Sequence, residues 1–408
     1  MTIKTLFEKT MVIALIALIV SIAGIGYLSY SISSVSEEFK VATTEVKKLS
    51  DRVEELSTKL DLIAEVVASE LGISKEELLT KAEDIVEKIR EEKMLIEKAK
   101  AEGRVVVYTS TDPRTAEVLK EAFERKYPFI TVEFVRGGPE AMATRFIEEF
   151  DRGVAYADVL SLGTVNSRLM VLERPERLLV YVPRTAEWLT PELRDPEGRW
   201  HSDRIILVSL AYNTKLLKLE EAPKTFKDLI DPKWKGKIAY VDFRIMAFGV
   251  QLLAAMEKEY GEDFIKKLAA QDIFFVGRSF VDPVARVVSG EFLLTTPPIT
   301  FVEVRKMEKD PIDWIRTADN VYFADLAWVG VASNAPHPNA AKLFVDFLFS
   351  DEGQAIYEKG GHSPLKPGVV FRNPDMSPKG KKIVFLEPLL GEKLKTYIER
   401  YAEMFFRR

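Results

Sequence analysis

The chain has 408 residues, a formal net charge of -5 at pH 7, 47% hydrophobic residues and no cysteine. This length can bury more than one hydrophobic core, and it predicts two or three structural units. The small net charge gives no indication of a nucleic-acid partner. The absence of cysteine excludes disulfides, thiolate metal sites and anchoring through a lipidated cysteine.

The N-terminal stretch predicts where the protein is located. Residues 10–36 carry no charge, and residues 11–28 are almost continuously apolar, which is close to the roughly 20 residues that a helix needs to cross a bilayer. Lysines precede this stretch and glutamates follow it, so the positive-inside rule predicts a cytoplasmic tail at residues 1–9. We therefore expect a single-pass anchor in the cell membrane at residues 10–30, with the rest of the chain on the extracytoplasmic side. A cleaved signal peptide is the alternative.

A heptad pattern follows, and it predicts a coiled-coil or helical stalk over residues 35–100. Apolar residues recur alternately every four and three positions, with valine frequent at a and leucine at d, which favours a parallel homodimer. The positions are Val35, Phe39, Ala42, Val46, Leu49, Val53, Leu56, Leu60, Ile63 and Val67. Gly72 interrupts the pattern, and Ser74 with Glu77 is typical of a capping box that begins a second helix. That helix either extends the stalk or packs on the globular part.

Residues 104–127 predict a strand, a polar loop and a helix. The apolar run at residues 105–108 gives way to Ser110, Thr111 and Asp112, and Pro113 is favoured at the first position of the helix that follows. The unpaired backbone N–H groups of such a helix start suit a small anionic or hydroxylated ligand. An ordinary, well-capped connection is the alternative.

Two more strands, at residues 131–135 and 158–162, alternate with helices and predict a parallel sheet. In such sheets ligands lie outside the carboxyl ends of the strands. The loops at residues 109–112, 136–138 and 161–164 should therefore share one edge. For their glycines, tight turns are the alternative to close ligand approach.

Residues 205–332 predict a second α/β unit with its own core and a strand that returns from it. The expected fold is thus α/β and two-lobed, with a hinge and an interlobe cleft. We expect the first lobe at residues 102–210, the second lobe at 211–325, and the return strand with the remainder of the first lobe at 326–408.

Several segments, in order, give the chain a family resemblance. They are VVVYTSTDPRTAEVLKEAFERKYP, ADVLSLG, SLAYNT, TFKDLIDPKWKGKIAYVD and PHPNAAKLFVDFLFSDEGQAIYEKGG. The chain resembles the extracellular solute-binding proteins of ABC transporters, most closely the ferric-iron-binding branch of the type 2 periplasmic-binding fold. The resemblance implies a receptor that closes on a solute and delivers it to a membrane permease driven by a cytoplasmic ATPase.

The iron ligands implied by that branch do not carry over to this chain. Asp112 stands where the branch has a histidine, Gly163 falls near the position of its glutamate, and residues 295–301 lack its tyrosine pair. Ferric iron prefers anionic oxygen donors. We therefore expect no bound metal and no cofactor, and a ferric-iron receptor remains the alternative.

The candidate ligand-binding residues lie on both lobes and are rich in hydrogen-bond donors. They predict a small, anionic solute. The residues are Ser110, Thr111, Asp112, Gly138, Gly163 and Thr164 on the first lobe, Asp242, Arg244 and Thr296 on the second, and Trp328 near the hinge. The alternatives are a surface ion pair for Arg244, a helix cap for Asp242 and a core position for Trp328.

The sequence thus predicts a membrane-anchored, extracytoplasmic solute-binding component of an ABC uptake transporter that works by hinge closure. No nucleophile–base pair or P-loop is present in the sequence, so we do not expect an enzyme. A sensory or adhesive ectodomain without a transport role is the rival from another class.

Overall fold

The computed structural model describes residues 38–406, and the chain divides into two units, Met1–Glu97 and Lys98–Arg408. The cytoplasmic tail and membrane anchor predicted at residues 1–30 lie outside the described residues. Within the described part, no helix combines the length and apolar character needed to cross a membrane.

The first unit contains helix α2 (Glu38–Leu71) and most of helix α3 (Lys75–Glu102). Gly72 separates them at a φ of +68°, a left-handed conformation that glycine adopts without strain. The predicted start of the second helix is confirmed, because the Ser74 hydroxyl accepts a hydrogen bond of 3.1 Å from the Glu77 amide. Val67 packs against Leu78 of α3.

The last turn of α3 belongs to the second unit. There the Glu102 carboxylate accepts hydrogen bonds from the backbone amides of Asn339 and Ala340, at 2.9 and 2.7 Å. These are the first amides of α11 (Pro338–Phe349), where the helix has no side-chain cap of its own.

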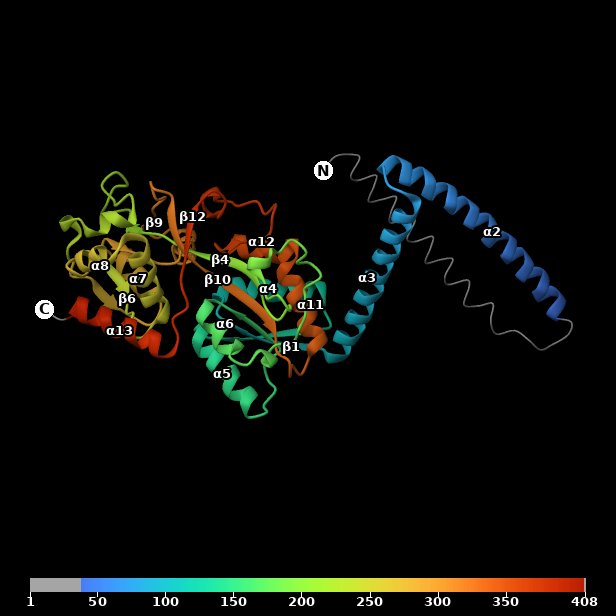
Figure 1. Ribbon diagram of the computed structural model, residues 1–408, viewed down its shortest axis with the longest axis horizontal. Helices are drawn as coiled ribbons and strands as arrows, with labels where there is room; N and C mark the ends of the chain where they lie inside the picture. Colours follow the sequence, from blue (N-terminus) through green and yellow to red (C-terminus); the bar gives the residue numbers. More distant parts are fainter. Residues whose placement is uncertain (1–37, 407–408) are drawn as a thin grey trace. The chain divides into compact units, whose positions relative to one another are not determined.

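The second unit contains two α/β lobes, which Figure 1 shows side by side. Lobe 1 is built on a seven-stranded sheet in the order β11-β4-β10-β3-β1-β2, with β12 beside one end of β10. Its strands are β1 (Arg104–Thr109), β2 (Thr131–Arg136), β3 (Val159–Leu162), β4 (His201–Val208), β10 (Val321–Val331), β11 (Ser363–Pro364) and β12 (Lys382–Phe385). Strands β1, β2 and β3 are mutually parallel, as predicted.

Helices cover both faces of this sheet. The side chains of β1 alternate between the two faces and are apolar on both, so each face must be covered. Val106 and Tyr108 face the core that contains Phe146 of α5. On α4, Phe123 packs edge-on against Phe344 of α11 at 5.1 Å between ring centroids. The helices of lobe 1 are α4 (Pro113–Lys126), α5 (Pro139–Asp151), α6 (Val165–Leu172), α11 and α12 (Asp351–Lys359).

Lobe 2 has a three-stranded sheet, β8-β5-β9, and a parallel pair, β6-β7. A single bridge between Ile238 and Leu294 joins the two and runs parallel. The strands are β5 (Ala211–Asn213), β6 (Ala239–Val241), β7 (Phe274–Val276), β8 (Leu294–Thr295) and β9 (Ile312–Trp314). The helices are α7 (Ala247–Tyr260), α8 (Glu262–Ala269), α9 (Val281–Val288) and α10 (Ile299–Met307).

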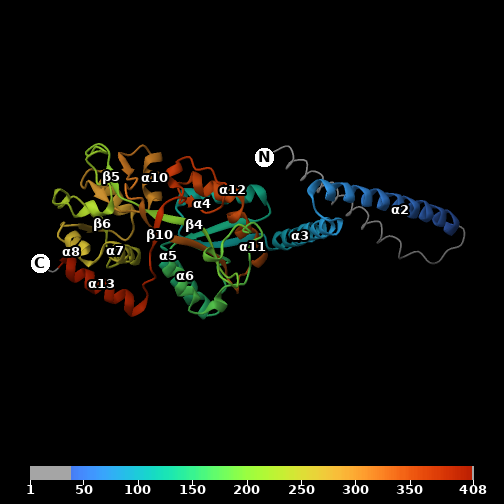
Figure 2. The same cartoon turned by 45° about the horizontal axis from the view of Figure 1, so that its top comes forward.

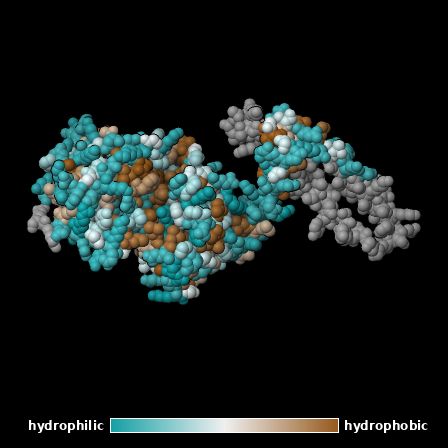
Figure 3. Space-filling model, viewed as in Figure 1, coloured by the Kyte–Doolittle hydropathy of each residue, from teal (hydrophilic) through white to brown (hydrophobic). Residues whose placement is uncertain are grey.

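The chain passes between the lobes three times, and the return strand predicted at residues 326–408 is only one of these passages. The first two passages are the β4–β5 connection and β10, and the third is residues 372–390, which contain β12 and lead into α13 (Gly391–Phe406). Figures 1 and 2 both show α13 on the lobe of α7 and α8, although we expected residues 326–408 to complete the first lobe. The reason is apolar packing, because Tyr401 and Phe405 contact the ring of Phe243. Figure 3 shows hydrophobic residues gathering where the two lobes meet.

Gly353, in the first turn of α12, provides a test of the packing between α11 and α12. A Cβ atom there would lie 2.2 Å from the Phe347 carbonyl oxygen, which is backbone and cannot move aside. Gly353→Ala should therefore lower the free energy of unfolding by about 3 kcal/mol or more, measured by urea denaturation.

Gly138→Ala is the matched control, because a Cβ atom there meets nothing within 4 Å and the φ is -61°. Equal denaturation midpoints for the two variants would contradict the tight contact between α11 and α12.

Candidate functional site

The carboxyl ends of β1, β2 and β3 meet at one edge of the lobe 1 sheet. Thr109 pairs with Arg136 of β2 and with Ser161 of β3. The three loops predicted to bind a ligand therefore start side by side, and the sequence analysis is confirmed on this arrangement of the strands.

Ser110 connects the first loop to the third. Its hydroxyl oxygen accepts a hydrogen bond of 2.7 Å from the Gly163 amide. A Cβ atom on Gly163 would lie 3.3 Å from Ile206 and 3.5 Å from this hydroxyl, so glycine permits the close approach of the two loops. The hydroxyl hydrogen of Ser110 remains available to donate to a ligand.

Thr111 is buried and is hydrogen-bonded to Arg204 of β4. The sequence analysis did not identify Arg204. The Arg204 guanidinium donates to the Thr111 hydroxyl at 3.0 Å and pairs with Asp203 at 2.5 Å. It also lies 4.4 Å from the ring centre of Tyr357 on α12. Because Arg204 is itself buried and paired, it supports the loop and does not contact the cleft.

Asp112 acts as the N-cap of α4. One carboxylate oxygen accepts from the Thr115 amide at 3.0 Å, and the other lies 2.9 Å from Nε2 of His362. Burial opposes ionisation of Asp112, but the hydrogen bond and charge of His362 hold the pKa of this carboxyl well below its usual value. Burial also lowers the pKa of His362. Both oxygens of Asp112 are thus engaged.

The N-terminus of α6 carries carboxylates as well. Thr164 caps this helix at a φ of +68°, and its hydroxyl donates to Glu140 at 2.7 Å. Both carboxylate oxygens of Asp325 on β10 lie 3.1 Å from the Val165 amide. A free anion therefore finds this helix start already occupied.

Gly138 differs from the other two helix starts. It is the exposed N-cap of α5, and no side chain caps the helix there. Pro139 follows at the first helical position. Gly138 is exposed, but Glu140 places a carboxylate in the first turn of this helix as well.

On lobe 2, Asp242 and Thr296 share an edge. Strands β6 and β8 run parallel through the Ile238–Leu294 bridge, so the residues that follow them lie at the same end. The hydroxyls of Thr295 and Thr296 are buried and have no hydrogen-bond partner among the described residues. Buried hydroxyls are normally paired. Because successive residues along a strand point to opposite faces, only one of these two hydroxyls can face a ligand at this edge.

The hinge brings this edge of lobe 2 toward lobe 1. Ser209 follows β4 and donates its amide to the Pro297 carbonyl at 3.3 Å, and Val208 bridges to Pro298. Because β4 runs in the same direction as β3, it leaves lobe 1 at the edge where the three loops lie. Thr296 is therefore next to the hinge, on the side of the candidate site.

Arg244 is not a free cation. Its guanidinium makes two hydrogen bonds to Asp242, at 2.8 and 2.6 Å, and lies 4.3 Å from the ring centre of Phe406. The hydrogen bond with Asp242 raises the pKa of Arg244, and the same bond lowers the pKa of Asp242. The ion pair that the sequence left open as an alternative is present.

Trp328 is a core residue of lobe 1. It is fully buried, and its indole N–H donates to the Ser167 hydroxyl at 2.9 Å. It pairs with Leu162 on one side and Ser202 on the other. The core position given as the alternative for Trp328 in the sequence analysis is the one that the structure shows.

Two further features bear on the kind of site. Within residues 38–406, no group of three histidine or acidic side chains is arranged to hold a metal ion. A separate pocket of about 430 Å³ lies on lobe 1, and none of the predicted site residues lines it. Its walls are Arg184, Thr185, Glu187, Trp188, Ser350, Asp351 and Lys366.

Comparison with known proteins agrees with the two-lobed architecture. Residues 176–386 match a family described as bacterial extracellular solute-binding protein. The chain is 24% identical over 295 residues to an Fe(3+)-binding periplasmic protein of Serratia marcescens, covering 69% of this chain and 84% of that protein. It is 26% identical over 285 residues to a putative 2-aminoethylphosphonate-binding periplasmic protein of Salmonella paratyphi A, covering 66% and 81%.

Among solved structures, the fold is similar to that of the periplasmic binding protein AfuA from Actinobacillus pleuropneumoniae, which has exogenous fructose-6-phosphate bound. The TM-score is 0.62 at 23% identity, over 75% of this chain and 99% of AfuA. The iron-bound protein HitA from Pseudomonas aeruginosa gives 0.58 at 21% identity, over 74% and 99%.

Asp325 provides a test of the electrostatics at this edge. Burial raises its pKa to about 7, opposed by hydrogen bonds from Leu326 and Val165 and by the charge of Arg168, while Glu140 adds to the rise. Between about pH 4 and pH 7 the folded chain then keeps a proton that the unfolded chain releases. The free energy of unfolding should fall over this range by up to about 4 kcal/mol.

Asp325→Asn should remove this slope when the free energy of unfolding is measured from pH 4 to pH 8. Asp375→Asn, at a carboxylate that is 53% exposed, should keep it. Identical slopes in the wild type and Asp325→Asn would show that Asp325 is ionised throughout.

Proposed function

Because the chain belongs to the family of bacterial extracellular solute-binding proteins, we propose that it binds a small anionic solute between its two lobes for an ABC uptake transporter. The solute is then passed to a membrane permease driven by a cytoplasmic ATPase. The rest of the proposal concerns the chemistry of the solute and how the chain is held at the membrane.

The observation that carries the choice of solute is the set of free hydroxyls on the two facing edges. Thr295 and Thr296 are buried without a partner on lobe 2, where one of them can face the solute, and Ser110 keeps a hydrogen to donate on lobe 1. The oxygen atoms of an oxyanion would accept these hydrogen bonds, and the exposed start of α5 adds backbone amides.

The described relatives support a phosphorus oxyanion in particular. One is named for 2-aminoethylphosphonate, and one structure contains fructose-6-phosphate. Other relatives are named for ferric iron, but the first-lobe carboxylate Asp112 is occupied by His362 and no metal-binding group of three is present among residues 38–406. Binding of ferric iron is therefore the alternative outcome of the test below.

Hinge closure would couple binding to the shape of the receptor. A solute held by Ser110 on lobe 1 gains the hydroxyl of Thr296 only when the lobes are together. It therefore stabilises the closed arrangement by the difference in affinity between the two forms.

The membrane anchor at residues 10–30 and a homodimer through the stalk are part of the same proposal. The uncharged run supports the anchor, and the heptad pattern supports the dimer. On α2, Ile63 of the heptad pattern is exposed, as are Leu62 and Val66 outside the pattern, whereas Val67 of the pattern packs against α3.

The first experiment is a thermal-denaturation screen of the full chain against phosphate, sulfate, 2-aminoethylphosphonate, fructose-6-phosphate, ferric citrate and neutral sugars. A bound solute at a hundredfold excess over its dissociation constant should stabilise the protein by about 2.7 kcal/mol. We expect a phosphorus oxyanion to raise the melting temperature. A shift with ferric citrate alone would overturn the anionic-solute proposal, and no shift at all would favour the non-transport ectodomain.

Substitutions then locate the site. Thr296→Val removes one donor and should weaken binding about tenfold in calorimetry. Arg244→Ala should weaken it further, because Asp242 is left as an unpaired negative charge at the edge. Thr396→Val and Arg125→Ala, whose side chains pair with Glu392 and Glu352 away from both edges, should leave affinity unchanged.

A further inference from the structure

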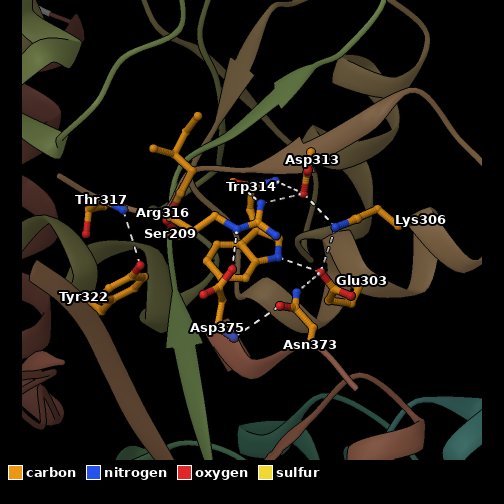
Figure 4. A network of polar contacts seen from close by, with 11 residues as sticks. Ser209, Glu303, Lys306, Asp313, Trp314, Arg316, Thr317, Tyr322, Asn373 and Asp375 are labelled. Carbon is orange, nitrogen blue, oxygen red and sulfur yellow. Dashed lines mark hydrogen bonds and ion pairs between the residues drawn. The ribbon is translucent and has the colours of Figure 1, made fainter. Parts of the chain in front are cut away.

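The third passage between the lobes, residues 372–390, is named here the strap. It begins on lobe 1, where the Arg372 amide donates to Glu358 of α12 at 2.7 Å. The next residues join a polar network on α10 and β9, shown in Figure 4. Asn373 reaches Glu303, and Asp375 accepts from Arg316 at 3.1 Å.

The C-terminal end of the strap contacts lobe 2. Leu386 and Leu389 lie in the lobe 2 core. Glu387 forms an ion pair with Lys258 of α7. This end of the strap, residues 386–389, is therefore packed on lobe 2, as is α13 beyond it.

One lobe 1 side chain is hydrogen-bonded to this part of the strap. Asn166 of α6 donates to the Leu389 carbonyl at 2.8 Å and accepts from the Leu389 amide at 3.0 Å. Its oxygen also accepts from Gln251 of α7 at 3.1 Å, and Gln251 donates to the Glu387 carbonyl at 2.8 Å. Asn166 and Gln251 are both almost fully buried.

Asn166 lies next to the candidate site, so these bonds connect the strap and α7 to it. Asn166 is the second residue of α6, directly after the predicted ligand loop that ends in Gly163 and Thr164. The same turn is capped by Asp325 through the Val165 amide. Any movement of the strap or α7 relative to lobe 1 must break these bonds or carry this turn with it.

We propose that Asn166 is a positioning residue that locks lobe 2 to the ligand-facing turn of α6. The lock holds the two lobes in the arrangement described here and so sets how far they separate before a solute enters. The inference deepens the proposed solute-binding function and rests on it for its biological use.

Loss of the Asn166 carboxamide should separate the lobes, because it leaves buried polar groups without partners. Without it, the Leu389 amide and carbonyl and one hydrogen bond of Gln251 are left unpaired in a buried place. Unpaired buried polar groups are unfavourable, and separation of the lobes lets water satisfy them.

The test measures the distance between the lobes in the full chain without any solute. The chain contains no cysteine, so nitroxide labels on cysteines introduced at Glu121 of α4 and Lys267 of α8, both exposed, report one lobe-to-lobe distance. We expect Asn166→Ala to move the distribution to longer distances and to broaden it. The Leu389 amide should exchange its hydrogen about tenfold faster.

Asn339→Ala is the control, because it also loses a side-chain amide pairing, to Glu102, which is partly buried and lies within the second unit away from the contact between the lobes. Asn166→Asp keeps the shape of the side chain and cannot donate to the Leu389 carbonyl, so it should shift the distance in the same direction if the alanine variant fails to fold. Gln251→Ala should shift it less, and adding it to Asn166→Ala should have little further effect.

Folded Asn166 variants with the wild-type distance distribution would overturn the inference. That result would leave the proposed function standing, because no solute is used. Conversely, the absence of any change in melting temperature in the solute screen would not contradict the role of Asn166, which is a property of the fold.

Discussion

The buried carboxylate of Asp325 is the contact on which the lobe 1 edge depends. It sits on β10, which passes between the lobes, and it caps the helix that carries Thr164 and Asn166. Burial of an acid without a full counter-charge is unfavourable, and the raised pKa of Asp325 reflects this. The hinge strand, the ligand loop and the contact with the strap thus meet at the first turn of α6.

The arrangement of charge has a consequence for how a solute is recognised. Carboxylates lie at the starts of α4 and α6 and, through Glu140, in the first turn of α5, and Arg244 on lobe 2 is paired with Asp242. The proposed anion would be recognised by hydroxyls and by the exposed start of α5, beside Arg136, which ends β2 at the same edge and donates to the Thr111 carbonyl. Hydroxyl donors select by geometry, because each must meet an acceptor at hydrogen-bond distance.

Much of the fold could be predicted from the sequence, because the strand–helix alternation of residues 104–172 is strong and local. The shared edge of Thr109, Arg136 and Ser161 follows from it. The state of the site residues could not be predicted in the same way. The partners of Thr111 and Asp112 are Arg204 and His362, which are 93 and 250 positions away along the chain. The periodicity of apolar residues carries no information on contacts between residues so distant in the sequence. For the same reason it did not indicate that Tyr401 packs with Phe243 on lobe 2.

The three passages between the lobes also fix the order in which the protein can fold. The lobe 1 core needs α11 and β10, which come after all the strands of lobe 2, and the lobe 2 core needs Tyr401. Neither core can be completed while the chain is still emerging from a translocation pore. Folding must wait for residues near position 400, and pairings of such long sequence separation form slowly. Truncation before position 400 should therefore leave the lobe 2 core incomplete even though all of its strands are present.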